Sequence, residues 1–387
     1  MKKYLLSFAV MVMGSAVLTG CLSDNDSDKK PVEYIVTEGA LIINNGNTAS
    51  SIDGSLTFLD FRTDPISVQQ NVFKMVNGKS LGGTPNDVIV HGNKIYIAGS
   101  DENVVFVLDK RNFKLLETIS TTEEMGDDKG TTPRHLVGYN GKVYVSTYGG
   151  YVGVIDTLSL TIGANPYKVG SYPEGLAIGG TSDTDAALYV ANSDYGYGNA
   201  SISKINLSNG SITEIRNEKI RNPQELAVAG DVIYVLDWGY YDANDDWKQK
   251  EAGVYEINGS TVRLVVPDAT GMAAGGRTIV TFNYPYGSTK PTYSRYNIAG
   301  VGTLANFSLN GGNPVVSPAA IAFDPNAQTV YIASRTMNPD TGYPSYTTDG
   351  FVNIYNLDGE FVGTTSYGTG IEPHAIAFTY GTAKLQY

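Results

Sequence analysis

The sequence predicts an all-β protein, and two features of its 387 residues support that prediction. Although 42% of the residues are hydrophobic, they show no long helical periodicity. Short apolar runs separated by glycine-rich or polar turns recur along the chain, as is typical of strands joined into hairpins. A chain of this length and apolar content can bury a large core, and we expect that core to be built from sheets.

A strand pattern repeats at intervals of about fifty residues, which is the strongest architectural signal in the chain. In each copy a proline is followed three positions later by an aliphatic residue, as Pro85 is followed by Val88. Proline cannot donate to a sheet ladder and therefore suits the first residue of a strand. Six copies begin at Thr84, Thr132, Tyr172, Asn222, Ser317 and Glu372, and a degenerate seventh copy without the proline begins at Thr270.

Each copy continues into further strands. In the first copy a polar turn at residues 91–93 leads to an apolar strand at 95–97, and a third strand follows at 104–108. Four short strands repeated at this period are typical of propeller blades. The sequence therefore predicts one domain over residues 36–387, a seven-bladed β-propeller of four-stranded antiparallel blades.

The two ends of the chain are expected to complete one blade together. Residues 39–61 align with the second and third strands of the other copies, whereas the C-terminal segment "EPHAIAF" supplies only a first strand. We therefore expect the N- and C-terminal strands to pair and close the ring. Residues 383–387 also have the pattern of a second strand and would compete with residues 41–45 for that place, so an eight-bladed or open arrangement is the alternative.

The N-terminus predicts a secreted, lipid-anchored protein. Residues 1–20 combine Lys2 and Lys3 with an apolar run too short for a comfortable membrane span, and they end before Cys21, the only cysteine. This pattern resembles a bacterial lipoprotein signal, with Cys21 as the lipidation site. Residues 21–35 are expected to form an acidic flexible tether, similar to the sequences that direct Bacteroidota lipoproteins to the outer face of the outer membrane. A spacer on a periplasmic lipoprotein is the alternative.

The charge excludes one class of partner. The formal net charge is −12, and removal of Lys2 and Lys3 with the signal peptide would make it more negative. No stripe of arginine or lysine offsets this charge, so we expect no nucleic acid partner.

Aromatic residues concentrate in the segments that join second to third strands, which in a propeller share a face with the segments leading into the first strands. Amphipathic aromatic rings give a large contact area at low entropic cost, which suits ligand recognition. The alternative is that each ring packs over a neighbouring blade. The predicted ligand-binding aromatics are Tyr148, Tyr151, Tyr195, Tyr197, Trp238, Tyr240, Tyr241, Tyr284, Tyr286 and Tyr343.

Polar residues are expected to surround the mouth of the central channel, because they follow the blade prolines or lie in the same loops. Their amide, carboxylate and cationic groups suit hydrogen bonding to the edge of a bound molecule, whereas the alternative is a set of solvated groups around a water-filled channel. The predicted members are Asn45, Asn86, Arg134, His135, Glu174, Glu225, Arg335 and His374.

The sequence shows no catalytic constellation. It has no nucleophile elbow, phosphate-binding loop or dinucleotide motif, and His91 is expected in a turn on the opposite face. We therefore predict a non-enzymatic protein that requires no cofactor or resident metal. Asp242, Asn244 and Asp246 have the alternate spacing that opens a calcium loop, but Trp247 and Gly253 stand where glycine and glutamate are needed, which favours a solvated acidic loop.

The segments "LYVAN", "KVYVSTYGGYVGVID" and "VYIAS" resemble the YVTN-type propeller repeat from about residue 36 onward. Together with the lipoprotein signal, the acidic tether and the aromatic loops, the chain resembles the surface cobalamin-binding propeller lipoproteins of Bacteroides (BtuG-like). That resemblance implies capture of vitamin B12 and other corrinoids at the cell surface. It also implies transfer to a TonB-dependent outer-membrane transporter, on which the propeller sits as a lid.

Three other functions remain open at the level of sequence. A surface glycan-binding lipoprotein would use the same aromatic and amide groups, because sugar rings also stack on tyrosine and tryptophan. A metal-dependent propeller lactonase or lyase would need Asp87, Glu174 and Glu225 to converge on a divalent ion. A scaffold or adhesive protein would need no small ligand.

Overall fold

The structure of the protein is a computed structural model that describes residues 32–180, 182–285, 287–299 and 302–385. Cys21, the predicted signal peptide, most of the predicted tether and Tyr286 lie outside the described residues. Within this part, no helix has the length and apolar character needed to span a bilayer.

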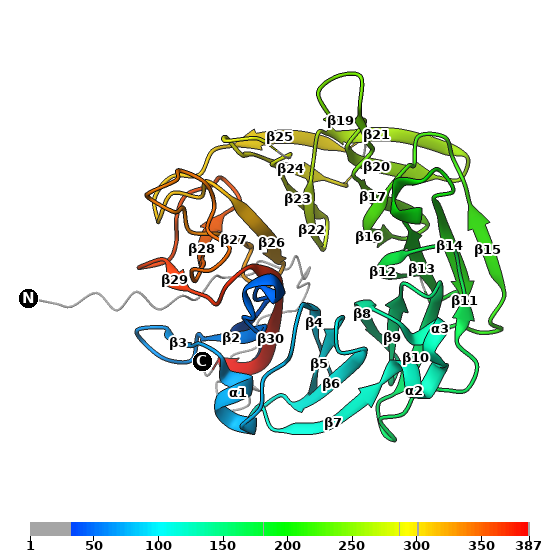
Figure 1. Cartoon of the computed structure of the whole chain (residues 1–387), viewed down its shortest axis with the longest axis horizontal. Coiled ribbons are helices and arrows are strands. Elements are labelled where there is room, and N and C mark those ends of the chain that lie inside the picture. The colour runs from blue at the N-terminus through cyan, green and yellow to red at the C-terminus, as the bar shows by residue number, and fades with distance from the viewer. Residues whose placement is uncertain (1–31, 181, 286, 300–301, 386–387) are drawn as a thin grey trace, which may run out of the picture.

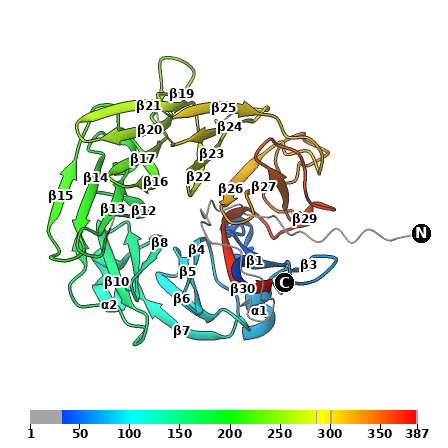
Figure 2. The same cartoon turned by 180° about the vertical axis from the view of Figure 1, so that it is seen from behind.

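Seven four-stranded antiparallel sheets form a closed ring, so the predicted seven-bladed β-propeller is confirmed (Figures 1 and 2). Blade 1 contains β4 (Pro85–His91), β5 (Lys94–Gly99), β6 (Val104–Asp109) and β7 (Leu115–Ser120). Blade 2 contains β8 (Pro133–Tyr139), β9 (Lys142–Thr147), β10 (Tyr151–Asp156) and β11 (Tyr167–Lys168). Blade 3 contains β12 (Pro173–Gly179), β13 (Ala187–Asn192), β14 (Ser201–Asn206) and β15 (Ile212–Ile215).

The remaining blades follow the same plan. Blade 4 contains β16 (Pro223–Ala229), β17 (Val232–Asp237), β20 (Gly253–Asn258) and β21 (Thr261–Pro267), with a small hairpin of β18 (Tyr240–Asp242) and β19 (Lys248–Lys250). Blade 5 contains β22 (Gly271–Gly275), β23 (Thr278–Asn283), β24 (Thr292–Asn297) and β25 (Thr303–Phe307). Blade 6 contains β26 (Pro318–Asp324), β27 (Thr329–Ser334), β28 (Phe351–Asn356) and β29 (Tyr367–Gly368).

The closing blade is built from both ends of the chain, as predicted. It contains β30 (Pro373–Leu385), β1 (Val32–Asn44), β2 (Ser55–Asp60) and β3 (Ser67–Gln69), with β30 innermost. Residues 383–385 continue β30 and pair with the start of β1, so they do not form a competing second strand. β30 pairs with β1 along its whole length, so the backbone hydrogen bonds of both chain ends are made within one blade. This pairing excludes the eight-bladed and open arrangements.

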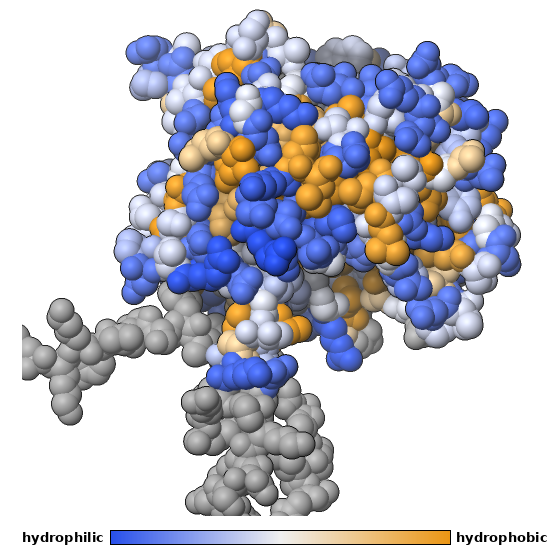
Figure 3. Space-filling view, turned by 90° about the horizontal axis from the view of Figure 1, so that it is seen from below, coloured by the Kyte–Doolittle hydropathy of each residue, from blue (hydrophilic) through white to orange (hydrophobic). Residues whose placement is uncertain are grey.

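The N-terminal boundary of the domain differs from the prediction. Residues 32–35, which we assigned to the flexible tether, belong to β1 and pair with the end of β30. Only Gly39–Asn44 of β1 also pair with β2, so the earlier residues and the end of β30 form a two-stranded ribbon beyond the blade. Seen edge-on, this ribbon forms the narrow extension beneath the ring (Figure 3). The polar composition of residues 32–35 does not indicate a strand, because these residues form one only by pairing with the distant end of β30.

Short helices occupy the connections between blades. The helices α1 (Val72–Asn77), α2 (Thr121–Met125) and α3 (Asp127–Gly130) lead from the outer strands towards the next inner strand. Two single 3₁₀ turns at Thr48–Ser50 and Asp194–Gly196 lie in the segments after second strands. Met75, Val76 and Leu116 are exposed on α1 and β7, and Figure 3 shows apolar side chains gathered across that outer edge of the ring.

The hydrophobic core lies between the blades. The described residues contain seven apolar clusters, and each one joins two neighbouring blades. In β1, Leu41 faces blade 1 and Ile42 faces blade 6, because side chains alternate along a strand. Both side chains are fully buried, and burial of each contributes about 1.5–3 kcal/mol. Every blade therefore depends on both neighbours, which makes closure a condition of stability.

Candidate functional site

The inner strands begin with a bulge that aims side chains at the channel mouth. In each blade that starts with proline, the pairing register shifts directly after the proline, as between Pro85 and Asp87. A bulge leaves a residue out of the ladder and re-aims its side chain, and bulges are common beside functional sites. In blade 5, which lacks the proline, β22 pairs with β23 without a shift. The residues placed in these bulges are Asn86, Arg134, Glu174, Gln224, Ala319 and His374.

Backbone hydrogen bonds join the loops after second strands to the residues that precede the prolines. Ser100 N donates to Thr84 O at 3.3 Å, Tyr148 N to Thr132 O at 3.2 Å and Ser193 N to Tyr172 O at 3.0 Å. The other three blades that start with proline contain the bonds Trp238 N to Asn222 O, Arg335 N to Ser317 O and Asn45 N to Glu372 O. In blade 5, Tyr284 N donates to the Thr270 hydroxyl at 2.8 Å instead. The aromatic loops and the channel mouth therefore lie on one face of the ring, as the sequence predicted.

Four of the residues before the prolines have strained backbones. Thr84, Thr132, Tyr172 and Glu372 have φ values of 44°, 53°, 49° and 56°. A positive φ costs about 1–3 kcal/mol for a residue other than glycine. The backbone hydrogen bonds from the loops hold these four residues in place.

A charged cluster across blades 1–3 forms one side of the mouth. Arg134 Nε donates to Glu174 Oε2 at 2.8 Å, and Arg134 Nη1 donates to Asn86 Oδ1 at 2.7 Å. The Tyr148 hydroxyl donates to the other oxygen of Glu174, and the Arg134 guanidinium lies 4.7 Å from the Tyr148 ring centre. Only 3% of Glu174 is exposed, so this is a buried carboxylate with a full set of partners.

His135 lies between two carboxylates. Its Nδ1 is 3.6 Å from Asp87 Oδ2, and its Nε2 is 3.7 Å from Glu174 Oε2. Asp87 also accepts hydrogen bonds from the backbone N–H groups of Val88 and Leu136, both at 2.8 Å. Desolvation opposes the imidazolium, but hydrogen bonding and attraction to Asp87 and Glu174 outweigh it and raise the pKa of His135. The surroundings of His135 therefore favour its protonated form more than water does.

For Glu225 and His374, unlike His135, the surroundings disfavour the charged form of the side chain. Burial raises the pKa of Glu225 to about 7, with His135 opposing the rise and Asp87 adding to it. Desolvation by the surrounding protein, together with the positive charges of Arg134, His135 and Arg335, lowers the pKa of His374. These mutual effects place both side chains near the charged cluster, and in each the surroundings favour the neutral form more than water does.

An aromatic cluster adjoins the charged cluster. The ring centres of Tyr148 and Tyr172 are 5.2 Å apart, those of Tyr172 and Tyr195 are 5.2 Å apart, and those of Tyr195 and Tyr197 are 6.1 Å apart. Tyr195 and Tyr197 are 58% and 76% exposed, which leaves their faces available to a ligand. We call Tyr148, Tyr172, Tyr195 and Tyr197 the tyrosine cluster.

The segment 193–199 holds the exposed tyrosines in place by its backbone. Asp194, Tyr195 and Gly196 have successive φ values of 47°, 54° and 79°. The buried Asp194 carboxylate accepts from Asn199 N at 2.8 Å, and Ser193 Oγ donates to Tyr172 O at 2.9 Å. Left-handed residues other than glycine persist where surrounding contacts fix them and are frequent at functional sites.

A second polar cluster lies where blade 6 meets the closing blade. Arg335 Nε lies 2.7 and 2.9 Å from the two carboxylate oxygens of Glu372, and its guanidinium lies 5.4 Å from the Tyr346 ring centre. Asn47 Nδ2 donates to Tyr346 O at 2.8 Å. The backbone of Asn45 links the closing blade to blade 1, and its side-chain oxygen is buried without a hydrogen-bond partner.

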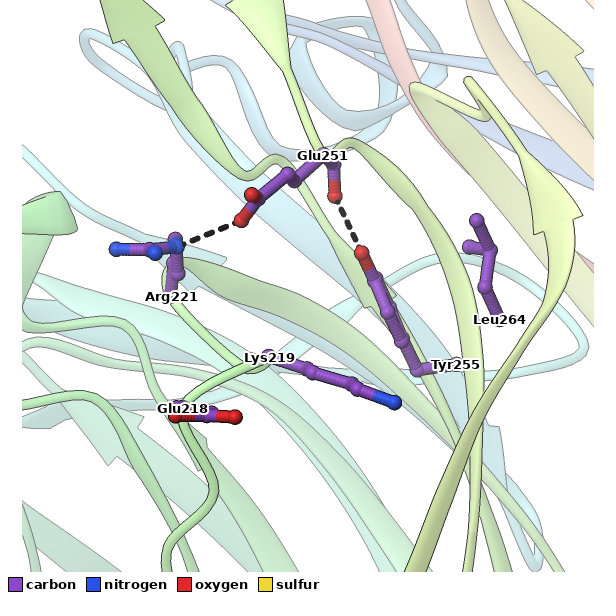
Figure 4. A pocket seen from close by; sticks show the side chains of 6 residues that line it. All are labelled: Glu218, Lys219, Arg221, Glu251, Tyr255 and Leu264. Atoms are coloured by element: carbon purple, nitrogen blue, oxygen red, sulfur yellow. Dashed lines mark hydrogen bonds and ion pairs between the residues drawn. The ribbon is translucent and has the colours of Figure 1, made fainter.

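The long loop of blade 4 carries a third group of aromatics. Trp238 Nε1 donates to Thr270 O at 3.0 Å, and Arg221 lies 5.0 Å from the Tyr240 ring centre. Arg221 Nε lies 2.8 Å from Glu251 Oε2, beside a cavity of about 360 Å³. Figure 4 shows this ion pair and the hydrogen bond from Tyr255 Oη to Glu251 O. Tyr241 and Trp247 are exposed on the β18–β19 hairpin.

Two acidic side chains of the hairpin that holds the calcium candidate, Asp242 and Asp245, are bonded within the turn. Asp242 Oδ1 accepts from Asn244 N at 2.9 Å, and Asp245 pairs with Lys248 and Lys250 at 2.6 and 2.5 Å. Asp246 has a φ of 51° in the turn. Among the residues the structure describes, no group of three or more histidine, cysteine or acidic side chains could hold a metal ion.

Several of the aromatic residues predicted to bind a ligand lie outside the tyrosine cluster. Tyr151 is the first residue of β10, packs beside the core cluster of blades 1 and 2, and lies 5.6 Å beneath Lys129 Nζ. Tyr284 packs against the cluster between blades 5 and 6, whereas Tyr343 is 73% exposed. Sequence reasoning missed Tyr172, Glu372 and Arg221 as members of the clusters. Tyr172 and Glu372 directly precede blade prolines, so the repeat alignment contained the signal that locates them.

The bulge position carries different side chains around the ring. Blades 1–4 have Asn86, Arg134, Glu174 and Gln224 there, whereas blade 6 has the short side chain of Ala319. Blade 6 also contributes Arg335, which pairs with Glu372 of the closing blade. A ligand seated over the mouth therefore meets charged groups on both sides and the exposed rings of the tyrosine cluster on one.

No protein-family model matches the chain, and no curated protein matches it in sequence. Solved structures match its fold. A putative 6-phosphogluconolactonase from Bacteroides uniformis is 14% identical with a TM-score of 0.58, covering 89% of this chain and 100% of that one. Hydrazine synthase of Kuenenia stuttgartiensis is 14% identical with a TM-score of 0.56, covering 78% and 95%. The WD40 repeats of RRP9 are 11% identical with a TM-score of 0.52, covering 76% and 84%.

These similarities establish a β-propeller fold. At such low identity they carry no information on ligand or reaction, because one fold supports many functions.

Proposed function

We propose that this protein is a surface-exposed outer-membrane lipoprotein that binds cobalamin and related corrinoids. The observation that carries the proposal is the tyrosine cluster, whose exposed rings stand directly beside the charged cluster at the channel mouth. A corrin is a broad amphipathic disc edged by amides. Its face would lie against Tyr195 and Tyr197, and its rim would meet the donors and acceptors of the mouth.

The polar groups around the mouth suit such a disc. The charged cluster lies on the side of blades 1–3, and Arg335 and Glu372 lie where blade 6 meets the closing blade. A large flat ligand with amides around its rim would meet hydrogen-bonding groups on both sides. This arrangement supports binding through shape and hydrogen bonds.

Two of the acidic groups at the mouth already have hydrogen-bond partners, and this favours binding over catalysis. The oxygens of Glu174 are occupied by Arg134 and Tyr148, and Asp87 is held by backbone N–H groups and faces His135. Two of the three acids that a metal-dependent lactonase or lyase would use, Asp87 and Glu174, therefore already have partners, which supports binding over catalysis. If a lactone substrate is turned over and chelation abolishes the turnover, the binding proposal fails.

The path of the chain supports attachment from the opposite face. β30 starts at the mouth with Pro373 and runs through the ring to the ribbon, where it pairs with Val32 at the start of β1. A lipid on Cys21 would therefore anchor the propeller on the side away from the tyrosine cluster. We propose a TonB-dependent transporter as the partner that receives the ligand.

Calorimetry on the lipid-free domain tests the proposal. We expect tight binding of cyanocobalamin, and a panel of neutral glycans provides the comparison. Absence of heat with cyanocobalamin together with clear heat for a glycan at the mouth would replace the corrinoid proposal with the glycan alternative. Metabolic labelling with palmitate should mark the full chain but not a Cys21→Ala variant.

A further inference from the structure

Three arginines on the face of the channel mouth share one arrangement, in which the guanidinium lies over a tyrosine ring and pairs with a glutamate. The guanidinium carbon lies 4.7, 5.0 and 5.4 Å from the ring centre in the three copies. The Nε atom lies 2.8, 2.8 and 2.7 Å from the glutamate oxygen. The copies are Arg134 with Tyr148 and Glu174, Arg221 with Tyr240 and Glu251, and Arg335 with Tyr346 and Glu372.

Two of these arginines also use a terminal nitrogen to contact the protein. Nη1 of Arg134 donates to Asn86 Oδ1 at 2.7 Å, and Nη1 of Arg335 lies 3.4 Å from Ser317 Oγ. The two side chains are only 19% and 22% exposed. Arg134 and Arg335 therefore join neighbouring parts of the ring.

Arg221 is the open copy of this arrangement. Its side chain is 47% exposed, and Nε is the one guanidinium atom that donates to an acceptor within the described part of the chain. Figure 4 shows that the terminal nitrogens extend away from Glu251 and Tyr255. The Tyr240 ring and Glu251 orient the guanidinium, but its Nη1 and Nη2 donors stay available. Two such donors match the oxygens of a phosphate or carboxylate.

Arg221 lies between the tyrosine cluster and the aromatic loop of blade 4. Its neighbour Asn222 accepts from Trp238 N at 3.0 Å, and the Asn222 side chain lies beside Gly196 in the loop that carries the exposed tyrosines. The backbone N–H groups of Arg221 and Asn222 both donate to the buried carboxylate of Asp237. A ligand whose face rests on the exposed tyrosines would therefore extend an edge towards Arg221.

We propose that Arg221 binds an anionic group on the edge of the ligand that occupies the mouth. This inference rests on the proposed function, and in a corrinoid the anionic group is the phosphodiester of the nucleotide tail. Nη1 and Nη2 donate to its oxygens while the corrin face lies on the tyrosine cluster. The net charge of −12 disfavours anions over most of the protein surface, so the phosphodiester is expected where an oriented cation has free donors. Arg221 then selects corrinoids with a nucleotide tail over those without one.

Competition calorimetry on the lipid-free domain tests this selection, with cyanocobalamin and dicyanocobinamide as ligands. Dicyanocobinamide has the corrin ring but lacks the phosphodiester. Arg221→Gln should weaken cyanocobalamin binding about ten- to hundredfold, the loss expected for hydrogen bonds to a charged group. Its affinity for dicyanocobinamide should stay within about twofold of the wild type. The wild-type affinity for cyanocobalamin should also fall more steeply with salt concentration than that of Arg221→Gln.

Glu251→Gln separates ligand recognition from a purely structural role of the ion pair. It removes a negative charge beside the phosphodiester, so cyanocobalamin should bind about two- to fivefold more tightly while dicyanocobinamide binding is unchanged. If the ion pair only held the loop, both variants would weaken the binding of both corrinoids.

Arg263→Gln is the matched control. Arg263 lies on β21, the outermost strand of the same blade, where it is 51% exposed and pairs with Glu256 at 3.0 Å. This variant should leave both affinities unchanged.

Two results would overturn the inference in different ways. If Arg221→Gln binds cyanocobalamin as tightly as the wild type, or loses affinity equally for both corrinoids, Arg221 does not bind the phosphodiester, whereas the proposed function stands. If the wild type binds neither corrinoid, the proposed function fails and the role of Arg221 fails with it.

Discussion

Replacing Arg134 by methionine should destabilise the propeller strongly, because it leaves the Glu174 carboxylate buried without its cation. Methionine keeps most of the apolar stem of arginine but makes none of its bonds to Glu174 and Asn86. Breaking a buried ion pair by removing one partner costs about 3–5 kcal/mol. Glu174 keeps its bond from Tyr148 and lies 3.7 Å from His135, so we expect a cost near the lower end, about 3 kcal/mol.

Urea denaturation followed by the fluorescence of Trp238 and Trp247 measures this loss. A second variant, Arg134→Met with Glu174→Gln, removes the stranded charge and should recover about 2 kcal/mol. Arg335→Met provides a matched comparison at the other ion pair of the mouth. The Glu372 side chain is 15% exposed, against 4% for Glu174, so its loss of a partner should cost only about 1–2 kcal/mol.

Two results would refute this reasoning. A cost below about 1 kcal/mol for Arg134→Met would mean that water reaches Glu174 at the mouth and screens its charge. Equal stability of the single and double variants would mean that the loss comes from the bond to Asn86 and not from the stranded carboxylate.

Three further predictions concern ligand binding, pH and ring closure. A Tyr195→Ala, Tyr197→Ala double variant should weaken cyanocobalamin binding at least about tenfold in calorimetry. Its melting temperature should change little, because the two rings are 58% and 76% exposed, and unchanged affinity would place the site elsewhere. The pKa of Glu225 is raised to about 7, so the folded state binds more protons than the unfolded state between its usual value and 7. The stability of the wild type relative to Glu225→Gln should therefore fall by about 1–2 kcal/mol as the pH rises from about 5 to 8. A pH-independent difference, like that expected for the exposed control Glu124→Gln, would contradict the assignment. Deletion of Pro373–Leu385 removes the innermost strand of the closing blade and should abolish cooperative thermal unfolding in calorimetry, and a retained sharp transition would show that the ring does not depend on closure.

The repeat made most of the fold predictable. Pro85, Pro133 and the equivalent prolines mark the inner strands, since a residue without an N–H fits the start of a strand, and this constraint is local. The N-terminal edge was not predictable in the same way. Residues 32–35 have a polar composition that resembles a tether, and they are ordered only because the end of β30, more than three hundred residues later, pairs with them.

The sequence predicted which kinds of residues form the candidate site, but not how their side chains are arranged. The repeat placed Arg134 and Glu174 after prolines, but it could not show that these residues bond to each other across blades 2 and 3. Tyr172 and Glu372 escaped notice because each was treated as the start of a repeat, although their backbones and side chains shape the mouth. Tyr151 belongs to a strand because its loop is shorter than the sequence indicated.

By itself the sequence determined the all-β class, the number of blades, the pairing of the two ends and the face on which the aromatic residues gather. These properties follow from short-range rules, namely strand alternation, turn chemistry and the position of proline. Only the tertiary structure decided which side chains meet at the mouth and which tyrosines stay exposed. Those outcomes depend on contacts between neighbouring blades and on how each bulge aims its side chain, and no local pattern specifies them.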